Sequence, residues 1–321
     1  MTGPVLEVIE PGLLTAVQDG GRRGYEALGI PRGGALDTLA FTWANRLAGN
    51  PPDAAVLETV LLGPTLVASD DCWLATAGAE DVTLDGRSRP AWSGFFVPSG
   101  GRVAVKATAG ARAYLAVHGG IAVEPVLGSR STNLEARFGG FEGRGLRRGD
   151  CVPVGEVTDL PGGPHDILRH PAPAASHVPM TVRVVVGPDE RLFSGGGLAQ
   201  FLATTYMVSP QSNHMGVRLQ GTPITAPAGN RLSQPMPVGG IQVPPDGQPI
   251  VLLAGRGTIG GYPLVATVIS ADLRLPAQAR PGDAIRFAAV TVEEAQGIAR
   301  AAAEDLAYGK PIAGRLRQEG R

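Results

Sequence analysis

The chain has 321 residues, of which 43% are hydrophobic, and it carries 28 basic and 29 acidic side chains. This length allows one large domain or two, with a buried core. The balanced charge gives no field that would steer the protein to nucleic acid or to an anionic membrane, and no apolar run is long enough to span a bilayer. The first residues lack the basic stretch and following apolar stretch of a secretory signal. We therefore predict a cytoplasmic protein.

Short β-type runs between Gly, Asp and Pro turns dominate the chain. A helix is predicted first, over residues 37–48, because Leu39, Trp43 and Leu47 share one stripe and Asp37 stands at the N-cap position. Further along, the sequence predicts helices at residues 197–204 and 291–308 and strands at residues 66–68, 72–75, 102–105, 113–117, 181–186, 249–254, 265–270 and 284–287. Many short strands with few helices indicate a mostly-β protein built of barrels or sandwiches.

A change of composition divides the chain. Around residues 155–179 the apolar periodicity disappears while Pro, Gly and His become more frequent, which is typical of a linker or a long surface loop. We predict an N-terminal β-barrel domain over residues 1–155, the linker over residues 156–179, and a C-terminal β-barrel domain with a C-terminal helix over residues 180–321.

The two halves share weak sequence echoes that occur in the same order. Segments 31–36, 119–125 and 148–152 are matched in type by segments 210–215, 239–245 and 281–285. Because three matches keep their order, they indicate a duplicated β-barrel. Two similar barrels would leave a cleft between domains, which is a frequent place for a ligand site.

Several well-known sites are absent from the sequence. It contains no G-x-x-x-x-G-K-[ST] loop for ATP and no G-x-S-x-G nucleophile turn. Lys106 and Lys310 are its only lysines, and neither lies in the Met-Lys-Met context of a biotin carrier. The five histidines lack the spacing of metal ligands, so we predict no metal site and no covalent biotin on this chain.

Two polar loops hold most of the candidate site residues. In residues 15–25, the side chains of Gln18, Asp19 and Arg22 are suited to an amide or a carboxylate ligand; the alternative is a tight turn in which Asp19 accepts backbone N–H groups. In residues 209–218, a hydroxyl, two amides, an imidazole and a guanidinium stand within ten residues, more than a turn needs. This second set comprises Gln211, Ser212, Asn213, His214 and Arg218.

Two further loops add smaller sets. Gln242 stands within an apolar run, and Asp246 follows in a Pro-Asp-Gly sequence that is also an ordinary β-turn signature. Gly260 and Gly261 precede Tyr262; paired glycines let the backbone approach a ligand closely, or serve a bend or bulge.

Two isolated side chains in β-type runs have simpler interpretations. Glu58 is either buried and paired with an arginine or exposed on one side of a strand, and the exposed arrangement is the commoner one. Cys72 is interpreted as a small buried apolar residue rather than a nucleophile.

The same loops carry a resemblance to a known family. The chain resembles the biotin-dependent carboxyltransferase-like family, also called the allophanate hydrolase subunit 2 family, over nearly its whole length. The motifs in its first half are G-L-L-T-A-V-Q-D-G-G-R-R-G-Y (12–25), L-G-I-P-R-G-G-A-L-D (28–37), A-N-R-L-A-G-N (44–50), R-A-Y-L-A-V-H-G-G-I (112–121) and V-L-G-S-R-S-T (126–132). Those in its second half are S-P-Q-S-N-H-M-G-V-R-L (209–219), G-G-I-Q-V-P-P-D-G-Q-P-I (239–250) and G-G-Y-P (260–263).

The resemblance implies two cyclophilin-like β-barrels and partner chains. In many bacteria this family supplies the C subunit of 5-oxoprolinase, which acts with the A and B subunits in the ATP-dependent opening of 5-oxo-L-proline to L-glutamate. On that hypothesis, Gln211, Asn213 and Arg218 stabilise developing negative charge, and ATP binds with or on a partner chain. Two alternatives stay open: a carboxyltransferase component of a biotin-dependent, urea carboxylase-like enzyme, and a non-catalytic regulatory partner of the B subunit.

The chain departs from the family pattern at four positions. Gly33 replaces a usual Ser, His214 a usual Arg, Gln234 a common Glu, and Gly255 a frequent Asp. The change at residue 214 matters most, because an arginine fork that grips a carboxylate with two bonds becomes a single, pH-dependent contact.

Overall fold

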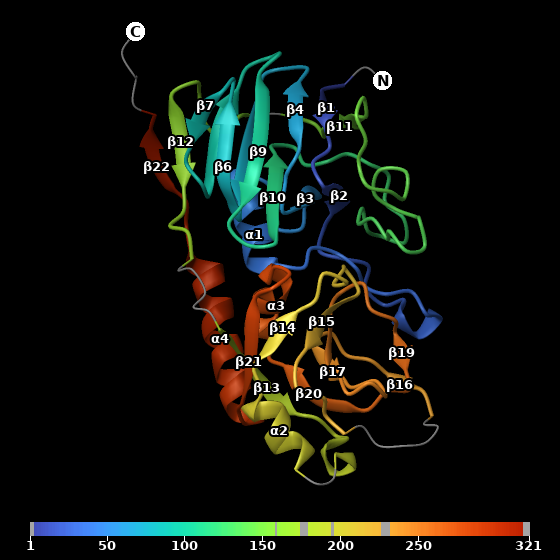
Figure 1. The fold of residues 1–321 in the computed structure, drawn as a ribbon. Helices are drawn as coiled ribbons and strands as arrows, with labels where there is room; N and C mark the ends of the chain where they lie inside the picture. Colours follow the sequence, from blue (N-terminus) through green and yellow to red (C-terminus); the bar gives the residue numbers. More distant parts are fainter. Residues whose placement is uncertain (1–2, 158, 174–178, 194–195, 226–231, 317–321) are drawn as a thin grey trace. The chain divides into compact units, whose positions relative to one another are not determined.

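The computed structural model describes residues 3–157, 159–173, 179–193, 196–225 and 232–316 (Figure 1). The chain divides into two compact units. The first contains residues 1–22, 33–173 and 310–321, and the second contains residues 23–32 and 174–309. The boundary after Pro173 falls within the stretch predicted as a linker. No helix among the described residues is both long and apolar enough to cross a membrane.

The first unit is built of two antiparallel sheets. The six-stranded sheet has the order β11 (Cys151–Pro153), β1 (Val5–Glu10), β4 (Thr65–Ala68), β9 (Arg102–Thr108), β6 (Ala79–Leu84) and β7 (Arg87–Arg89). The seven-stranded sheet has the order β2 (Leu14–Gln18), β3 (Val56–Val60), β10 (Arg112–Val117), β5 (Cys72–Ala77), β8 (Ser93–Val97), β12 (Asp166–Arg169) and β22 (Ile312–Arg315). Strand β12 therefore lies within the predicted linker and pairs with β8.

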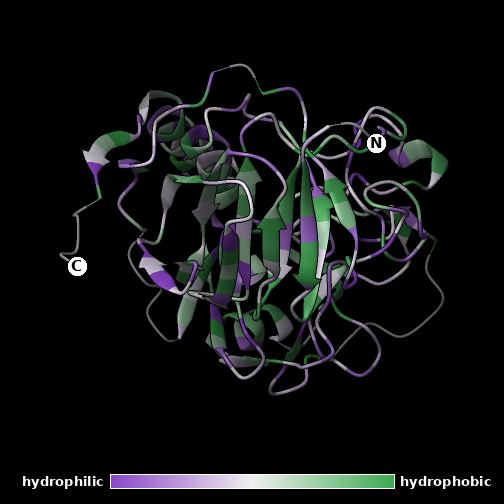
Figure 2. Ribbon diagram, turned by 90° about the horizontal axis from the view of Figure 1, so that it is seen from above, coloured by the Kyte–Doolittle hydropathy of each residue, from purple (hydrophilic) through white to green (hydrophobic). Residues whose placement is uncertain are grey.

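One apolar core joins these two sheets. Leu6 and Leu66 come from the six-stranded sheet, and Leu57, Leu74 and Leu115 come from the seven-stranded sheet, and all are at most 1% exposed. Both sheets thus turn one face inward, as the alternation of side chains along a strand allows. Figure 2 shows the hydrophobic residues concentrated along such strands and the hydrophilic ones in the connecting loops.

Helix α1 (Thr38–Leu47) covers part of the first unit, where the sequence predicted a helix. The Asp37 side chain accepts a hydrogen bond from Ala40 N (3.1 Å), which satisfies one of the free N–H groups at the helix start. The helix buries Trp43 and Leu47, and Trp73 of β5 donates from Nε1 to Leu47 O (2.8 Å). The predicted cap and apolar stripe are therefore what fix this helix.

The second unit contains a closed seven-stranded barrel. Its order is β13 (Met180–Val186), β20 (Leu264–Val268), β17 (Gly240–Gln242), β18 (Ile250–Leu252), β15 (Gly216–Gln220), β14 (Tyr206–Val208) and β21 (Ala284–Ala289). A parallel β13–β21 pairing closes it. A separate two-stranded sheet is formed by β16 (Gln234–Pro235) and β19 (Ile259–Gly260). The mostly-β prediction is confirmed by these sheets and by this barrel.

Helices are the minor part of the second unit. They are α2 (Gly197–Ala203), α3 (Arg274–Gln278) and α4 (Val292–Tyr308), with the 3-10 turns η1 (Glu26–Leu28), η2 (Glu190–Leu192) and η3 (Ser270–Asp272). Helix α4 starts with the predicted capping box, in which Thr291 Oγ1 accepts from Glu294 N and Glu294 accepts from Thr291 N. Phe201 of α2 stacks on Phe287 of β21, with ring centroids 4.7 Å apart.

Candidate functional site

A cavity of about 270 Å³ lies against strands β15, β17 and β18 of the barrel in the second unit. Its floor is apolar, because Met236, Ile250 and Leu252 line it and belong to one buried cluster with Leu264. Strands β15, β17, β18 and β19 supply half of its lining residues. An apolar floor with a few polar groups above it is the usual composition of a small-molecule site.

Two polar side chains of the wall come from the loop 209–218, as the sequence predicted for a site. Asn213 Oδ1 accepts from Met215 N (2.9 Å) and Gly216 N (3.3 Å), which turns the chain into β15 and leaves the Asn213 Nδ2 group as its donor for a ligand. Arg218 follows on β15 with an exposed side chain, opposite Ile250 of β18. An amide and a guanidinium therefore border the same space.

The opposite wall comes from two other predicted loops. Half-buried Gln242 stands on β17, and Gly260 and Gly261 bring the backbone to the cavity beside Tyr262, which is 45% exposed. A Cβ atom at Gly260 would lie 3.1 Å from Met236 Cε, so this glycine lets β19 lie close against the cavity floor. Six predicted residues thus meet in one cavity: Asn213, Arg218, Gln242, Gly260, Gly261 and Tyr262.

Arg256 also lines this cavity, and the sequence predictions omitted it. Its side chain is only 7% exposed and donates from Nε to Met236 O (2.6 Å), whereas its Nη1 group has no hydrogen-bond partner among the described residues. Burial lowers the pKa of this guanidinium; the negative charge of Glu26 raises it and the positive charge of Arg32 lowers it. The only sequence signal was one arginine between two glycines, in G-R-G-T.

The remaining residues predicted from the second unit lie beside the cavity, outside its described lining. Ser212 Oγ donates to Ser209 O (2.8 Å) and accepts from Arg218 N (3.1 Å), so this hydroxyl shapes the loop. Asp246 Oδ1 accepts from Gln248 N (3.0 Å) in an ordinary turn. Gln211 has an exposed side chain, and His214 is half-buried. Their roles in binding or catalysis stay predictions.

The first predicted loop belongs to the first unit as far as Arg22, and there the fold uses its Asp19 carboxylate. The Asp19 carboxylate accepts from Gly21 N (2.8 Å), Ser129 Oγ (2.7 Å), Arg130 N and Ser131 Oγ. Asp19 is 9% exposed. These bonds tie the loop 15–25 to the loop that follows residue 126.

Arg22 and Gln18 are buried beside this carboxylate. Arg22 donates to Val126 O (3.0 Å) and Ser131 O (2.9 Å) and lies 4.6 Å from the ring centroid of Phe138. Gln18 donates from Nε2 to Thr132 O (3.3 Å). Each side chain is 1% exposed. Their predicted contact with substrate stays a prediction. Their observed contacts are those of a buried cluster, in which Gln18 Oε1 and Arg22 Nη1 have no hydrogen-bond partner among the described residues.

Glu58 differs from the exposed arrangement expected for it. It is 5% exposed, accepts from Tyr114 Oη (2.7 Å) and Leu36 N (3.0 Å), and lies 3.6 Å from Arg112 Nε. Tyr114 in turn accepts from Asp37 N (2.8 Å). Burial and the neighbouring carboxylates raise the pKa of Tyr114, which keeps it a neutral donor. The exposed expectation was wrong, because Glu58 faces Tyr114 directly across the β3–β10 pair.

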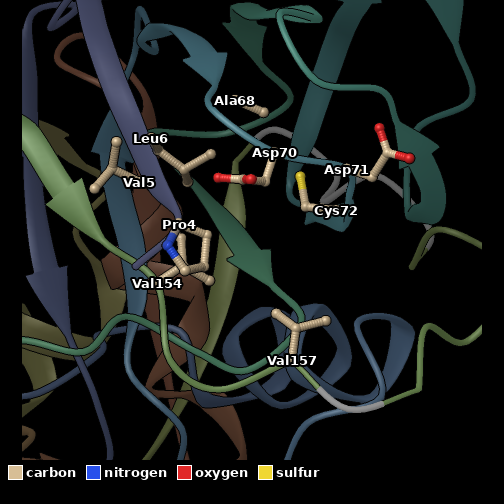
Figure 3. Close-up of a pocket in the computed structure, with 9 residues that line it drawn as sticks. All are labelled: Pro4, Val5, Leu6, Ala68, Asp70, Asp71, Cys72, Val154 and Val157. Atoms are coloured by element: carbon tan, nitrogen blue, oxygen red, sulfur yellow. The ribbon is translucent and has the colours of Figure 1, made fainter. Parts of the chain in front are cut away.

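A second, smaller cavity of about 160 Å³ lies in the first unit (Figure 3). It is mainly apolar and contains Cys72, with Asp70 and Asp71 beside it. Burial and the two carboxylates raise the pKa of the Cys72 thiol to about 12, so a reactive thiolate is disfavoured. The side chain is 4% exposed, which confirms the prediction of a small buried residue.

Two of the departures from the family pattern, Gly255 and His214, lie next to each other in the structure. A Cβ atom at Gly255 would lie 2.5 Å from His214 Nδ1, so the glycine makes room for this ring. At a third position, Gln234 Nε2 donates to Asp189 Oδ2 (3.0 Å). A glutamate there would place a second carboxylate against Asp189, so the glutamine suits this neighbour.

The chain is similar to known proteins over nearly its whole length. The family model of the carboxyltransferase domain, subdomain A and B, matches residues 28–289. The chain belongs to this carboxyltransferase-domain family. It is 37% identical to the C subunit of 5-oxoprolinase from Escherichia coli, over 98% of this chain and 100% of that protein.

Solved structures agree with this assignment. The crystal structure of the protein TTHA0988 matches with a TM-score of 0.80 and 37% identity, over 89% of this chain and 56% of that one. The structure of the K. lactis urea amidolyase matches with a TM-score of 0.85 and 29% identity, over 95% of this chain and 20% of that one. The chain thus spans about half of the first protein and a fifth of the second.

Proposed function

We propose that this chain is the C subunit of a cytoplasmic, ATP-dependent 5-oxoprolinase complex that opens 5-oxo-L-proline to L-glutamate. The observation that carries the proposal is the end-to-end correspondence with the C subunit of a 5-oxoprolinase, over 98% of this chain and the whole of the relative. Urea amidolyase, by contrast, corresponds over only 20% of its length. In this proposal, the A and B subunits complete the working enzyme.

The cavity in the second unit is the substrate site of this proposal. Opening a lactam places negative charge on its carbonyl oxygen, and fixed donors stabilise such charge. Asn213 Nδ2 and the guanidinium groups of Arg218 and Arg256 are donors that border the cavity, with Gln242 and Tyr262 as further contacts. Gln211, predicted to act with them, lies outside the described lining and would need to turn inward on binding.

ATP in this proposal activates the carbonyl oxygen and binds with or on a partner chain. The sequence has no P-loop, and the cavity of about 270 Å³ lies just below the ~300–1,000 Å³ typical of sites for drug-sized ligands. That size suits a small lactam better than a nucleoside triphosphate. The triphosphate chain would therefore meet groups that a partner supplies.

Co-expression with the neighbouring A and B subunits tests the proposal. The purified complex is expected to release glutamate from 5-oxo-L-proline only when ATP is present. Arg218→Ala and Asn213→Ala should each lower kcat by about 10²–10³-fold if they act as transition-state donors. Arg300→Ala, on the exposed face of α4, is the matched control and should keep the wild-type rate. A wild-type complex that forms no glutamate would refute the proposal.

A carboxyltransferase role is the second candidate, favoured by the family description and by the urea amidolyase match. It requires a biotinylated carrier on another chain, because this chain has no biotin-acceptor lysine context. Carboxylation of urea by the complex and a biotinylated carrier, with no turnover of 5-oxo-L-proline, would favour it. Full activity in the Asn213 and Arg218 variants would instead favour a non-catalytic regulatory partner of the B subunit.

A further inference from the structure

The cavity of the second unit is lined by two arginines, Arg218 and Arg256, and by no acidic residue among those described. Glu26 is the acid whose charge influences Arg256, and Arg32 opposes its effect. A space with two guanidinium groups and no carboxylate on its wall favours an anionic ligand.

The two arginines differ in what they can contribute. Arg218 is exposed, so water hydrates and screens its charge. Arg256 is 7% exposed, and its Nη1 donor has no partner among the described residues. Leaving a buried charged donor unsatisfied is costly, and a ligand that accepts from it removes that cost. The buried arginine is therefore the stronger anchor.

The protein holds Arg256 ready for such a ligand. Its Nε donates to Met236 O, and Met236 itself is 3% exposed and belongs to the apolar floor. One edge of the guanidinium is thus fixed to the backbone, while Nη1 is left without a hydrogen-bond partner among the described residues. The planar fork of arginine matches the two oxygens of a carboxylate.

We propose that Arg256 binds the carboxylate of the substrate, so that the cavity selects a small amide bearing a carboxylate over a neutral one. The proposal rests on the proposed function only for the identity of that amide. With the carboxylate held at Arg256, the amide end of the ligand lies among the donors of Asn213, Arg218 and Gln242. Neutral urea, which lacks a carboxylate, would leave Arg256 unsatisfied.

Calorimetric titration of the co-expressed complex without ATP tests this directly. The probes are 5-oxo-L-proline, 2-pyrrolidinone, which has the same ring without the carboxylate, urea, bicarbonate and inorganic phosphate. We expect 5-oxo-L-proline to bind about 10- to 100-fold more tightly than 2-pyrrolidinone, because hydrogen bonds to charged groups are worth that ratio. Equal affinities, tighter binding of phosphate or bicarbonate, or no binding of any probe would overturn the proposal.

Variants of the arginines test which residue causes the preference for a ligand with a carboxylate. Arg256→Gln should weaken 5-oxo-L-proline by about 10- to 100-fold and leave 2-pyrrolidinone unchanged, while Arg256→Lys should keep part of the affinity. Arg218→Gln should have a smaller effect, and Arg300→Gln none. An Arg256→Gln complex that binds 5-oxo-L-proline as wild type does would overturn the proposal; if that variant does not fold, the wild-type probe series decides. Carboxylate-selective binding without glutamate formation would refute the proposed function and leave Arg256 as the anchor.

Discussion

Two polar loops, residues 15–22 of the first unit and residues 209–218 of the second unit, are similar in composition, since each combines amide, acid or hydroxyl groups with an arginine. The polar side chains of the two loops have different surroundings in the structure. Asp19 accepts four hydrogen bonds from its own unit and Arg22 donates to two carbonyl groups, whereas Arg218 lies exposed on a cavity wall. The fold thus uses the Asp19 carboxylate, whereas the Arg218 guanidinium is accessible to a ligand.

Replacing Asp19 should have the largest effect on stability. Asp19→Ala removes one buried carboxylate and leaves Gly21 N, Arg130 N and two serine hydroxyls without their acceptor. We expect the free energy of unfolding to fall by about 3–5 kcal/mol, as when one partner of a buried charged network is removed. Urea denaturation followed by tryptophan fluorescence measures it.

Asp246→Ala is the control for this variant. Asp246 also accepts one backbone N–H in a turn, but it is exposed, so the loss should stay near ~1 kcal/mol or less. If Asp19→Ala were as stable as this control and instead raised the KM of the complex, the first loop would be a ligand site after all. The distinction between the two loops would then fail.

The sequence was sufficient to predict elements and site residues whose deciding contacts are local in the chain. Helix α1 followed from the Asp37 cap and an apolar stripe, and the gathering of Asn213 and Arg218 followed from their place in one ten-residue loop. Arg256 was missed because its burial depends on the apolar floor and on Met236, twenty residues earlier in the chain. Glu58 was misjudged for the same reason, since its partners Tyr114 and Arg112 reach it only through the pairing of β3 with β10.

A tyrosine from each unit provides another, smaller test of the comparison. Tyr114→Phe removes the donor to Glu58 and the acceptor of Asp37 N, both buried, so unfolding should become easier by about 1–3 kcal/mol. Tyr262→Phe alters a half-exposed side chain at the cavity and should change stability by less than about 0.5 kcal/mol. Thermal unfolding of both variants, together with the KM of both complexes, separates a structural hydroxyl from one at a ligand site. A stable Tyr114→Phe protein would show that the buried network contributes little.

The cavity of the first unit can be tested without any substitution, and the expected effect is the smallest of these tests. Cys72 borders the apolar cavity of the first unit with a thiol pKa of about 12, whereas Cys151 is exposed. At pH 8 almost no Cys72 is thiolate, and alkylation requires the thiolate, so iodoacetamide should modify one cysteine per native chain and two only after unfolding. Mass spectrometry of tryptic peptides identifies which one. Rapid labelling of Cys72 in the native protein would mean that this cavity opens to solvent and holds a reactive group. The cavity of the first unit would then be a candidate catalytic site in addition to the arginine-lined cavity.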